Sequence, residues 1–260
     1  RIVEDGMKKG FKGNWGAQAY TKKMGIVQDV NRLSWNSYIS QLRKLNLPLD
    51  ASAKVVGPRH LHGSQWGFID PVDTPDGGNI GLHKHLSILT HITSGGSGYP
   101  IINWLRSHTP LKLLEECNAE CLNSQTKTFV NGNWIGVIPE PLETVQLLKT
   151  LRRNGIIPVY ISISFDYRVN ELLIYTDGGR LSRPIYYVDK FKASYDRGEY
   201  ISKINDGTLT WKEIVSGIKD KKVDYSLKSQ QIYAVQELYG EDKIDFQRYS
   251  SMVEYIDAAE

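Results

Sequence analysis

The sequence lacks most of the features that mark a membrane, secreted or self-sufficient catalytic protein. No apolar run reaches the roughly 18 residues of a membrane span, and the first residues show no signal-peptide pattern. Only two cysteines are present, Cys117 and Cys121, which excludes a disulfide framework and favours a reducing compartment. The phosphate loop G-x-x-x-x-G-K-S/T and the motifs G-x-G-x-x-G, G-x-S-x-G and H-E-x-x-H are all missing.

The composition that remains is typical of a folded protein. Hydrophobic residues make up 40% and charged residues 23%, and 260 residues suit one large or two small domains. The net charge of +3 neither demands nor excludes a nucleic-acid partner. Basic residues gather within residues 1–65, where the only acids are Glu4, Asp5, Asp29 and Asp50. Because phosphate neutralisation supplies most nucleic-acid affinity, any such contact is expected in this segment.

The pattern along the chain predicts a mixture of helices and strands. Apolar steps of three and four predict one or two helices within residues 26–47, ended by Pro48, and residues 66–99 predict turns with short strands. Further on, the sequence predicts an Asn-Gly hairpin over 128–137, a helix over 141–154, strands over 156–164 and 171–176, and mostly helix from 190. The fold class is therefore α+β with several subdomains, divided into residues 1–95, 96–189 and 190–260. The start at Arg1 and the stop at Glu260 lead us to expect an internal piece of a longer chain.

Histidines and acids raise the alternative of a metal site. Five of the six histidines and three aspartates fall close together: His60, His62, His83, His85, His91, Asp70, Asp73 and Asp76. Two His-x-His pairs could place ligands on one face of a strand. No complete metalloenzyme signature is present, however, and Asp before Pro or Gly usually marks a turn. Cys117 and Cys121 form a single pair, which favours structural thiols over zinc.

The most informative stretch is long and gapless, and it runs from Arg59 to Leu82. It follows the pattern R-x-L/V-H-x-S/T-x-W/Y-G-x-I/V-x-P-x-E/D-T-P-E/D-G-x-x-x-G-L through Arg59, Leu61, His62, Ser64, Trp66, Gly67, Pro71, Asp73, Thr74, Pro75, Asp76, Gly77, Gly81 and Leu82. This stretch resembles the signature of the second-largest, beta-like subunits of multisubunit DNA-directed RNA polymerases. We refer to residues 59–82 as the signature segment.

Other segments resemble the same family in the same order. These segments are residues 13–16, 25–32, 41–48, 128–137, 150–155, 172–184 and 253–258, and the later ones are similar to the eukaryotic, archaeal and large-DNA-virus type. Two departures stand out: Asp73 and Asp76 replace the usual glutamates, and Lys44 replaces an arginine, which loses the planar fork for phosphate. These departures from the family pattern indicate a divergent lineage, and our hypothesis is a large DNA virus.

The resemblance implies a role in holding nucleic acid rather than in chemistry. Residues 1–95 would form the fork region, 96–189 a first external domain, and 190–260 a second external domain leading to the hybrid-binding domain. Positions similar to those lining the RNA–DNA hybrid and the downstream fork are Lys22, Lys23, Gln28, Asn31, Arg32, Arg43, Lys44, Lys54 and Arg59. Positions similar to those near the active centre, expected to brace loops by hydrogen bonds, are His62, Asp73, Asp76 and Asn79, with Arg59 again.

The same resemblance implies that catalysis belongs to another chain. The family uses two-metal phosphoryl transfer, with Mg²⁺ held by an aspartate triad of the largest subunit. No D-x-D-x-D cluster occurs here, so we expect no catalytic residue, no bound cofactor and no activity of this chain alone. The implied partners are the largest and other polymerase subunits, template DNA and nascent RNA, with no membrane. The implied location is intracellular: nucleus, cytoplasm or virion, depending on lineage.

Four alternatives stay open at this point. Each lysine could instead belong to a solvated face, and Arg32 or Arg43 could form a structural ion pair. The chain could be a free-standing fragment that binds nucleic acid or a partner without catalysis, which salt-sensitive binding without turnover would favour. It could also be a metal-dependent hydrolase that uses His60, His62, His83 and Asp73, which predicts stoichiometric zinc or manganese.

Overall fold

The computed structural model describes residues 1–11, 29–47, 49–50, 52, 54–189, 191–218 and 250–260. These residues divide into two compact units. Unit 1 comprises residues 1–61 and 69–86, and unit 2 comprises residues 62–68 and 87–260. The signature segment is therefore shared, because its residues 62–68 belong to unit 2 and the rest to unit 1.

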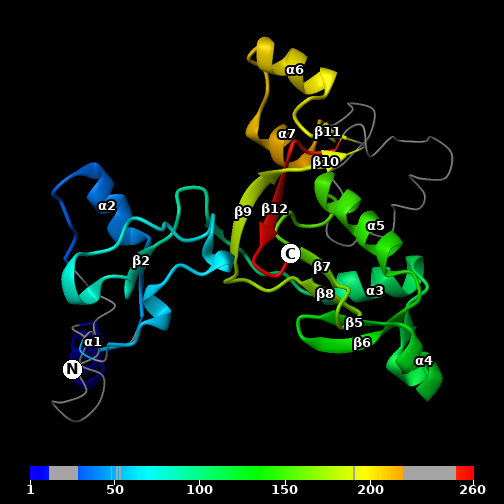
Figure 1. Ribbon diagram of the computed structural model, residues 1–260, viewed down its shortest axis with the longest axis horizontal. Helices are drawn as coiled ribbons and strands as arrows, with labels where there is room; N and C mark the ends of the chain where they lie inside the picture. The colour runs from blue at the N-terminus through cyan, green and yellow to red at the C-terminus, as the bar shows by residue number, and fades with distance from the viewer. Residues whose placement is uncertain (12–28, 48, 51, 53, 190, 219–249) are drawn as a thin grey trace. The chain divides into compact units, whose positions relative to one another are not determined.

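Unit 1 consists of short elements joined by turns (Figure 1). Its described elements are α1 (Ile2–Phe11), α2 (Trp35–Leu42), β1 (Lys44–Asn46), the 3₁₀ helices η2 (Gly57–Arg59) and η4 (Gly77–Asn79), and β2 (His83–His85). Helix α2 begins at a capping box, in which Ser34 and Ser37 satisfy each other's backbone N–H groups. Strands β1 and β2 pair antiparallel, with Lys44 opposite His85 and Asn46 opposite His83.

The prediction of one or two helices within residues 26–47 is confirmed for α2 and wrong for β1. Within its described residues, 29–34 are not helical, the helix covers Trp35–Leu42, and the chain then enters β1. Helical spacing is a local signal, whereas β1 exists because β2 lies about 40 residues further along and supplies its hydrogen-bond partners. Pro48, predicted to end the helix, lies outside the described residues.

Unit 2 is built around a five-stranded sheet (Figure 1). Its strands are β4 (Lys112–Leu113), β5 (Thr126–Val130), β6 (Asn133–Ile138), β7 (Ser162–Asp166) and β8 (Glu171–Tyr175), in the order β4-β6-β5-β8-β7, and only β5 and β8 run parallel. Side chains from this sheet pack with those of α3 (Tyr99–His108) and α5 (Pro141–Arg153) in one apolar core. Trp104, Leu151 and Leu172 are among its fully buried members.

Local sequence signals predicted parts of this unit correctly. Asn131 and Gly132 have φ of +50° and +79°, which suits the tight turn of the predicted hairpin β5–β6. Helix α5 ends at Arg153, one residue before the predicted end, with Asn154 as its C-cap and Gly155 next at φ of +66°. The predicted strand over 156–164 begins only at Ser162.

A three-stranded antiparallel sheet completes unit 2, in the order β12-β9-β3. It consists of β3 (His91–Ile92), β9 (Leu181–Tyr186) and β12 (Val253–Asp257). The remaining elements of the unit are η3 (Gly63–Gln65), η5 (Leu114–Glu116), α4 (Ala119–Ser124), β10 (Val188–Asp189), β11 (Lys192–Ala193), α6 (Gly198–Asn205) and α7 (Trp211–Ser216). The expectation of mostly helix from residue 190 is confirmed for α6 and α7 and wrong for β11 and β12.

Buried ion pairs connect the last residues of the chain to the rest of unit 2. The Arg152 side chain is 2% exposed and donates to Glu254 at 2.6 Å and to Glu260 at 2.7 Å. Glu254 also pairs with Arg153, and Asp257 pairs with Arg180 at 2.5 Å. Residues 250–260 are therefore an integral part of this unit.

The mixture of helices with parallel and antiparallel strands confirms the predicted α+β class. The boundaries predicted near residues 95 and 189 stay a prediction. No helix in the described part of the chain has the length and apolar character needed to cross a membrane.

Candidate functional site

The centre of the signature segment is a turn closed by one threonine. The Thr74 hydroxyl donates to the His83 carbonyl oxygen at 2.8 Å and accepts from the Gly81 N–H at 2.8 Å. Gly81 has φ of +73°, and a Cβ there would lie 2.6 Å from the Arg59 carbonyl oxygen. Glycine is thus required for two reasons, the left-handed backbone and the close approach of the Arg59 backbone.

The Arg59 guanidinium braces the same turn from its other side. Its Nη1 donates to the carbonyl oxygens of Gly78 at 2.7 Å and Ile80 at 2.8 Å, and its Nε donates to Val55 at 3.2 Å. The fork geometry of arginine suits several carbonyls at once, which a lysine could not match. Arg59 was predicted both to contact nucleic acid and to brace loops, and the described hydrogen bonds are of the bracing kind.

Asp73 links three elements of unit 1. One carboxylate oxygen accepts from the Ser40 hydroxyl of α2 at 2.6 Å, and the other lies 3.3 Å from Nδ1 of His85. The same Nδ1 lies 2.8 Å from the Asp73 carbonyl oxygen, so this nitrogen carries the proton and donates. Ser40 and His85 were missed as bracing residues, because each is distant in sequence from Asp73 and no local pattern marks the pair.

The other predicted bracing residues are less involved. Asp76 stands before η4 without a capping hydrogen bond from its side chain, and Asn79 is an exposed residue within η4. His62 belongs to unit 2, where its Nδ1 accepts from the Ser64 N–H at 3.2 Å. The structure therefore brings Arg59 and Asp73 into one hydrogen-bonded region of unit 1 with Thr74 and Gly81.

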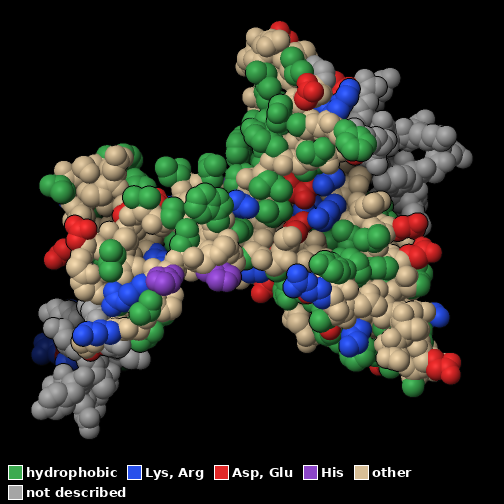
Figure 2. Space-filling model, viewed as in Figure 1, with side chains coloured by type: hydrophobic (Ala, Val, Ile, Leu, Met, Phe, Trp, Pro, Cys, Tyr) green, Lys and Arg blue, Asp and Glu red, His purple; other side chains and the backbone are tan. Residues whose placement is uncertain are grey.

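The predicted cationic residues of unit 1 are at least partly exposed where they are described. Lys44 lies on β1 and Lys54 in a loop, and both are exposed, while Arg43 is half-buried. The Arg32 guanidinium lies 5.4 Å from the ring centre of Tyr38, and Asn31 contacts Gln41 and Ser37. Lys22, Lys23 and Gln28 lie outside the described residues. Within each unit, the described Lys and Arg side chains on the face drawn in Figure 2 form small separate groups.

Lys44 shares a face of the β1–β2 ribbon with two histidines. Cross-strand neighbours on that face are Lys44, Asn46, His83 and His85. Burial lowers the pKa of His83, and the nearby Lys44 and His85 lower it further. Protonation of His83 is therefore disfavoured near neutral pH, so Lys44 supplies the permanent positive charge of this face.

The candidate metal ligands do not assemble. Among the described residues, no group of three or more His, Cys, Asp or Glu side chains could hold a metal ion. Of the residues named for the hydrolase alternative, His60, His83 and Asp73 lie in unit 1 and form no such group, and His62 lies in unit 2. Cys117 and Cys121 are free and half-buried.

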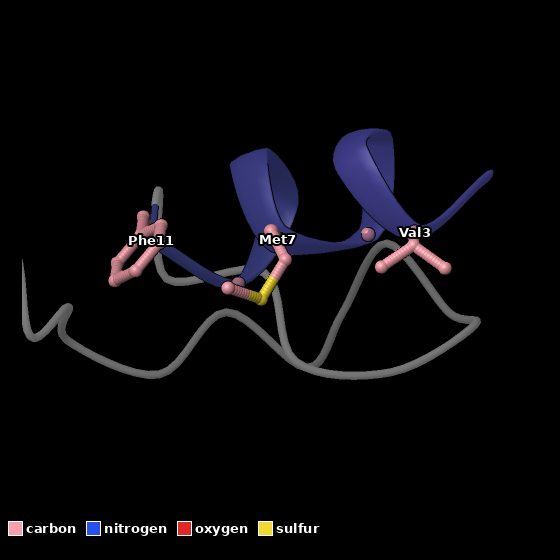
Figure 3. A pocket seen from close by; sticks show the side chains of 5 residues that line it. Val3, Met7 and Phe11 are labelled. Carbon is pink, nitrogen blue, oxygen red and sulfur yellow. The ribbon is translucent and has the colours of Figure 1, made fainter. Parts of the chain in front are cut away.

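Helix α1 carries a separate apolar feature. Val3, Met7 and Phe11 follow one another at steps of four and point to the same side of the helix (Figure 3). With Gly6 and Gly10 they line a small pocket, and none of these five residues carries a polar side chain. These five residues therefore offer the pocket apolar contact and no polar or titratable side chain.

Comparison with known proteins gives a consistent answer. The family model for RNA polymerase Rpb2, domain 3, matches residues 28–92, and the model for Rpb2, domain 4, matches residues 128–189. The chain is 33% identical to DNA-directed RNA polymerase II subunit RPB2 of Schizosaccharomyces pombe over 262 aligned residues, which cover all of this chain and 20% of that protein. It is 40% identical to DNA-directed RNA polymerase II subunit 2 of Arabidopsis thaliana, over 74% of this chain and 16% of that protein.

A viral relative is also similar. DNA-directed RNA polymerase subunit 2 of Acanthamoeba polyphaga mimivirus is 32% identical, over 82% of this chain and 18% of that protein. The chain thus spans about a fifth of the length of the curated relatives it matches. The predicted resemblance is confirmed, and the chain belongs to the family of second-largest subunits of multisubunit DNA-directed RNA polymerases, of which it carries domains 3 and 4.

Proposed function

We propose that this chain acts as part of a DNA-directed RNA polymerase, in which unit 1 holds the RNA–DNA hybrid and the downstream fork near the active centre. The observation that carries the proposal is the braced signature turn within the domain 3 match. Arg59 and Thr74 donate hydrogen bonds to backbone carbonyl oxygens of unit 1, and these bonds fix the loop. The exposed Lys44 and Lys54 take no part in them. No described residue forms a hydrogen bond or ion pair with either ammonium group, so both can meet phosphates, which give affinity without sequence preference.

In this proposal the chain supplies binding and positioning, and no step of the chemistry. Mg²⁺ would be held by the largest subunit, and no residue of this chain is assigned to it. The partners would be the largest subunit, other polymerase subunits, template DNA and nascent RNA. The purified chain alone is expected to incorporate no nucleotide in the presence of Mg²⁺ and a primed template.

The first test is the salt dependence of binding to a fluorescently labelled RNA–DNA hybrid. Each contact of a lysine with a phosphate contributes about one unit to the slope of log affinity against log salt. Lys44→Gln and Lys54→Gln are each expected to reduce that slope by about one and to weaken binding equally for hybrids of different sequence. The matched control is Lys112→Gln, which changes an exposed lysine of β4 in unit 2.

Two results would count against the proposal. If Lys112→Gln lowers the slope as much as Lys44→Gln, the binding is a general effect of charge and unit 1 has no special role. If the chain fails to enter a complex with the largest subunit and the other subunits yet still binds the hybrid, the free-standing binding fragment is the better description.

A further inference from the structure

The first turn of the signature segment, residues 62–68, rests on hydroxyl groups of unit 2. The Gly67 carbonyl oxygen accepts from the Ser87 hydroxyl at 2.8 Å and from the Thr90 hydroxyl at 3.3 Å. The Thr90 hydroxyl also donates to the Phe68 carbonyl oxygen at 2.8 Å. This turn is thus held by groups outside the signature segment, and all of them belong to unit 2.

Arg183 of β9 packs on the same turn. Its guanidinium carbon lies 5.2 Å from the centre of the Phe68 ring, and Phe68 is 6% exposed. Gly67 has φ of +82°, and a Cβ there would lie 2.1 Å from Nη1 and 2.9 Å from Cζ of Arg183. The guanidinium therefore occupies the space that any side chain at position 67 would need.

The Arg183 side chain starts from a rigid base. Strand β9 is the central strand of the β12-β9-β3 sheet, and residue 183 is paired with Ile256. Pro184 follows directly, and a residue before proline is restricted to extended backbone. The direction in which the Arg183 side chain leaves the sheet is therefore restricted by the pairing with β12 and by Pro184.

The Arg183 side chain has one unfavourable and one favourable feature at this place. Its Nε is buried and has no hydrogen-bond partner within the described residues, which lowers stability. A planar guanidinium can stack flat on an aromatic ring, which an ammonium group cannot do in the same way. Arg183 therefore leaves one of its own hydrogen-bond donors unsatisfied while its guanidinium packs on the Gly67–Phe68 turn.

We propose that Arg183 is a positioning residue, by which domain 4 of this family fixes the Gly67–Phe68 turn of the signature segment. Arg183 falls within the domain 4 match and the turn within the domain 3 match, so the contact couples the two domains. Its consequence for transcription rests on the proposed function, because only then does the signature segment lie near an active centre. The coupling itself depends on the geometry of unit 2.

Hydrogen exchange of the full chain tests the coupling. The Phe68 N–H donates to the Gln65 carbonyl oxygen and the Ser87 N–H to the Phe68 carbonyl oxygen, each at 3.0 Å, so both amides report on the turn. Arg183→Ala is expected to speed their exchange about tenfold, and Arg183→Lys by less. The Asn131 amide of the β5–β6 turn, which donates to the Ile174 carbonyl oxygen of β8 at 2.9 Å, should be unchanged. Arg168→Ala is the matched control, because Arg168 lies 5.8 Å from the Tyr167 ring at an exposed place.

The results separate a positioning role from a general structural one. Unchanged exchange at Phe68 and Ser87 in Arg183→Ala would overturn the proposal, and so would equal acceleration at Asn131. Gly67→Ala is a second variant, expected to speed the same two amides because its Cβ displaces the guanidinium. Since removal of Arg183 also removes that clash, the double variant should show less acceleration than the product of the two single effects. Simple multiplication of the two effects would count against the coupling.

Elongation by the assembled polymerase forms a separate measurement. Arg183→Ala is expected to slow elongation, and Arg183→Lys to restore part of the rate. Faster local exchange with an unchanged elongation rate would contradict the proposed place of the signature segment near the active centre. The positioning of the turn by Arg183 would still be supported by the exchange data.

Discussion

The two units of this protein are stabilised in different ways. In the described part of unit 1, Leu82 is the one large hydrophobic side chain that is fully buried, while Leu33, Trp35 and Val72 are mostly exposed. Unit 2 has a continuous apolar core and a buried network around Arg152. Unit 1 therefore depends on hydrogen bonds that brace its turns, whereas unit 2 depends on packing and buried charge.

The difference predicts where single substitutions will act. In unit 2 a change within the apolar core or the Arg152 network is expected to lower the stability of the whole unit, because these residues pack as one cooperative cluster. In unit 1 a change should mostly alter a local turn. A braced turn among exposed side chains also suits a surface that meets another molecule, which agrees with the role proposed for the signature segment.

The largest effect is expected from removal of the buried guanidinium in unit 2. Arg152→Ala leaves Glu254 and Glu260 without their main partner in a buried environment, at a cost of about 3–5 kcal/mol. The measurement is the free energy of unfolding from denaturant titration. Arg106→Ala is the control, because it breaks an exposed pair with Glu116, for which roughly 0–1 kcal/mol is expected. If the two variants lose similar amounts of stability, the buried ion pairs of Arg152 stabilise unit 2 no more than an exposed pair does.

A glycine pair tests the corresponding statement for unit 1. Gly77 and Gly81 both have positive φ, of +76° and +73°. A Cβ at Gly77 meets nothing within 4 Å, whereas one at Gly81 would lie 2.6 Å from backbone of Arg59. Gly77→Ala should cost about 1–2 kcal/mol from backbone strain alone, and Gly81→Ala about 1–3 kcal/mol more because backbone must move.

The readout for this pair is local. The Leu47 N–H donates to the Leu82 carbonyl oxygen at 3.1 Å, so its exchange reports on the end of the β1–β2 ribbon. Gly81→Ala should speed that exchange far more than Gly77→Ala, with the Asn131 amide of unit 2 as reference. Equal effects of the two substitutions would show that the approach of Arg59 to Gly81 does not matter for unit 1.

The same contrast explains what the sequence could and could not predict. Local signals sufficed for the Asn131-Gly132 turn and for the end of α5, because turn and cap residues act on their own neighbours. Strand β12 was missed because it exists through pairing with β9, about 70 residues earlier in the chain. Pairing over such a distance leaves no periodic mark in either segment.

In the candidate site, too, the sequence located some residues and the folded structure was needed for others. The family pattern located Arg59 and Asp73, since both lie within one gapless stretch of sequence. It did not locate Ser40 or His85 as the partners of Asp73, because a hydrogen-bond partner is chosen by the folded chain. Lys44 was predicted to lie on a helix and instead lies on β1, where it faces His85 across the ribbon.

Acid should produce the smallest of these effects and should separate the units again. Burial by itself raises the pKa of Glu254, but the charges of Arg152 and Arg153 outweigh it and hold the pKa below its ordinary value of 4.5. A carboxyl group with a lowered folded-state pKa contributes stability that is fully present above pH 4.5 and is lost as pH falls through the folded-state pKa. The free energy of unfolding of unit 2 is therefore expected to decrease below about pH 4.5. A lowering of the Glu254 pKa by one pH unit corresponds to about 1.4 kcal/mol of this decrease.

Glu254→Gln tests this assignment. The variant should be less stable at neutral pH, because it loses the charge that pairs with Arg152 and Arg153, and its stability should fall less steeply below pH 4.5. Denaturant titrations at a series of pH values measure both the stability at neutral pH and its decrease in acid. Exchange of the Leu47 amide in unit 1 should be the same in the variant and the parent at each pH. An acid dependence identical to that of the parent would mean that other carboxyl groups carry the effect, and a parallel change at Leu47 would mean that the two units do not respond separately.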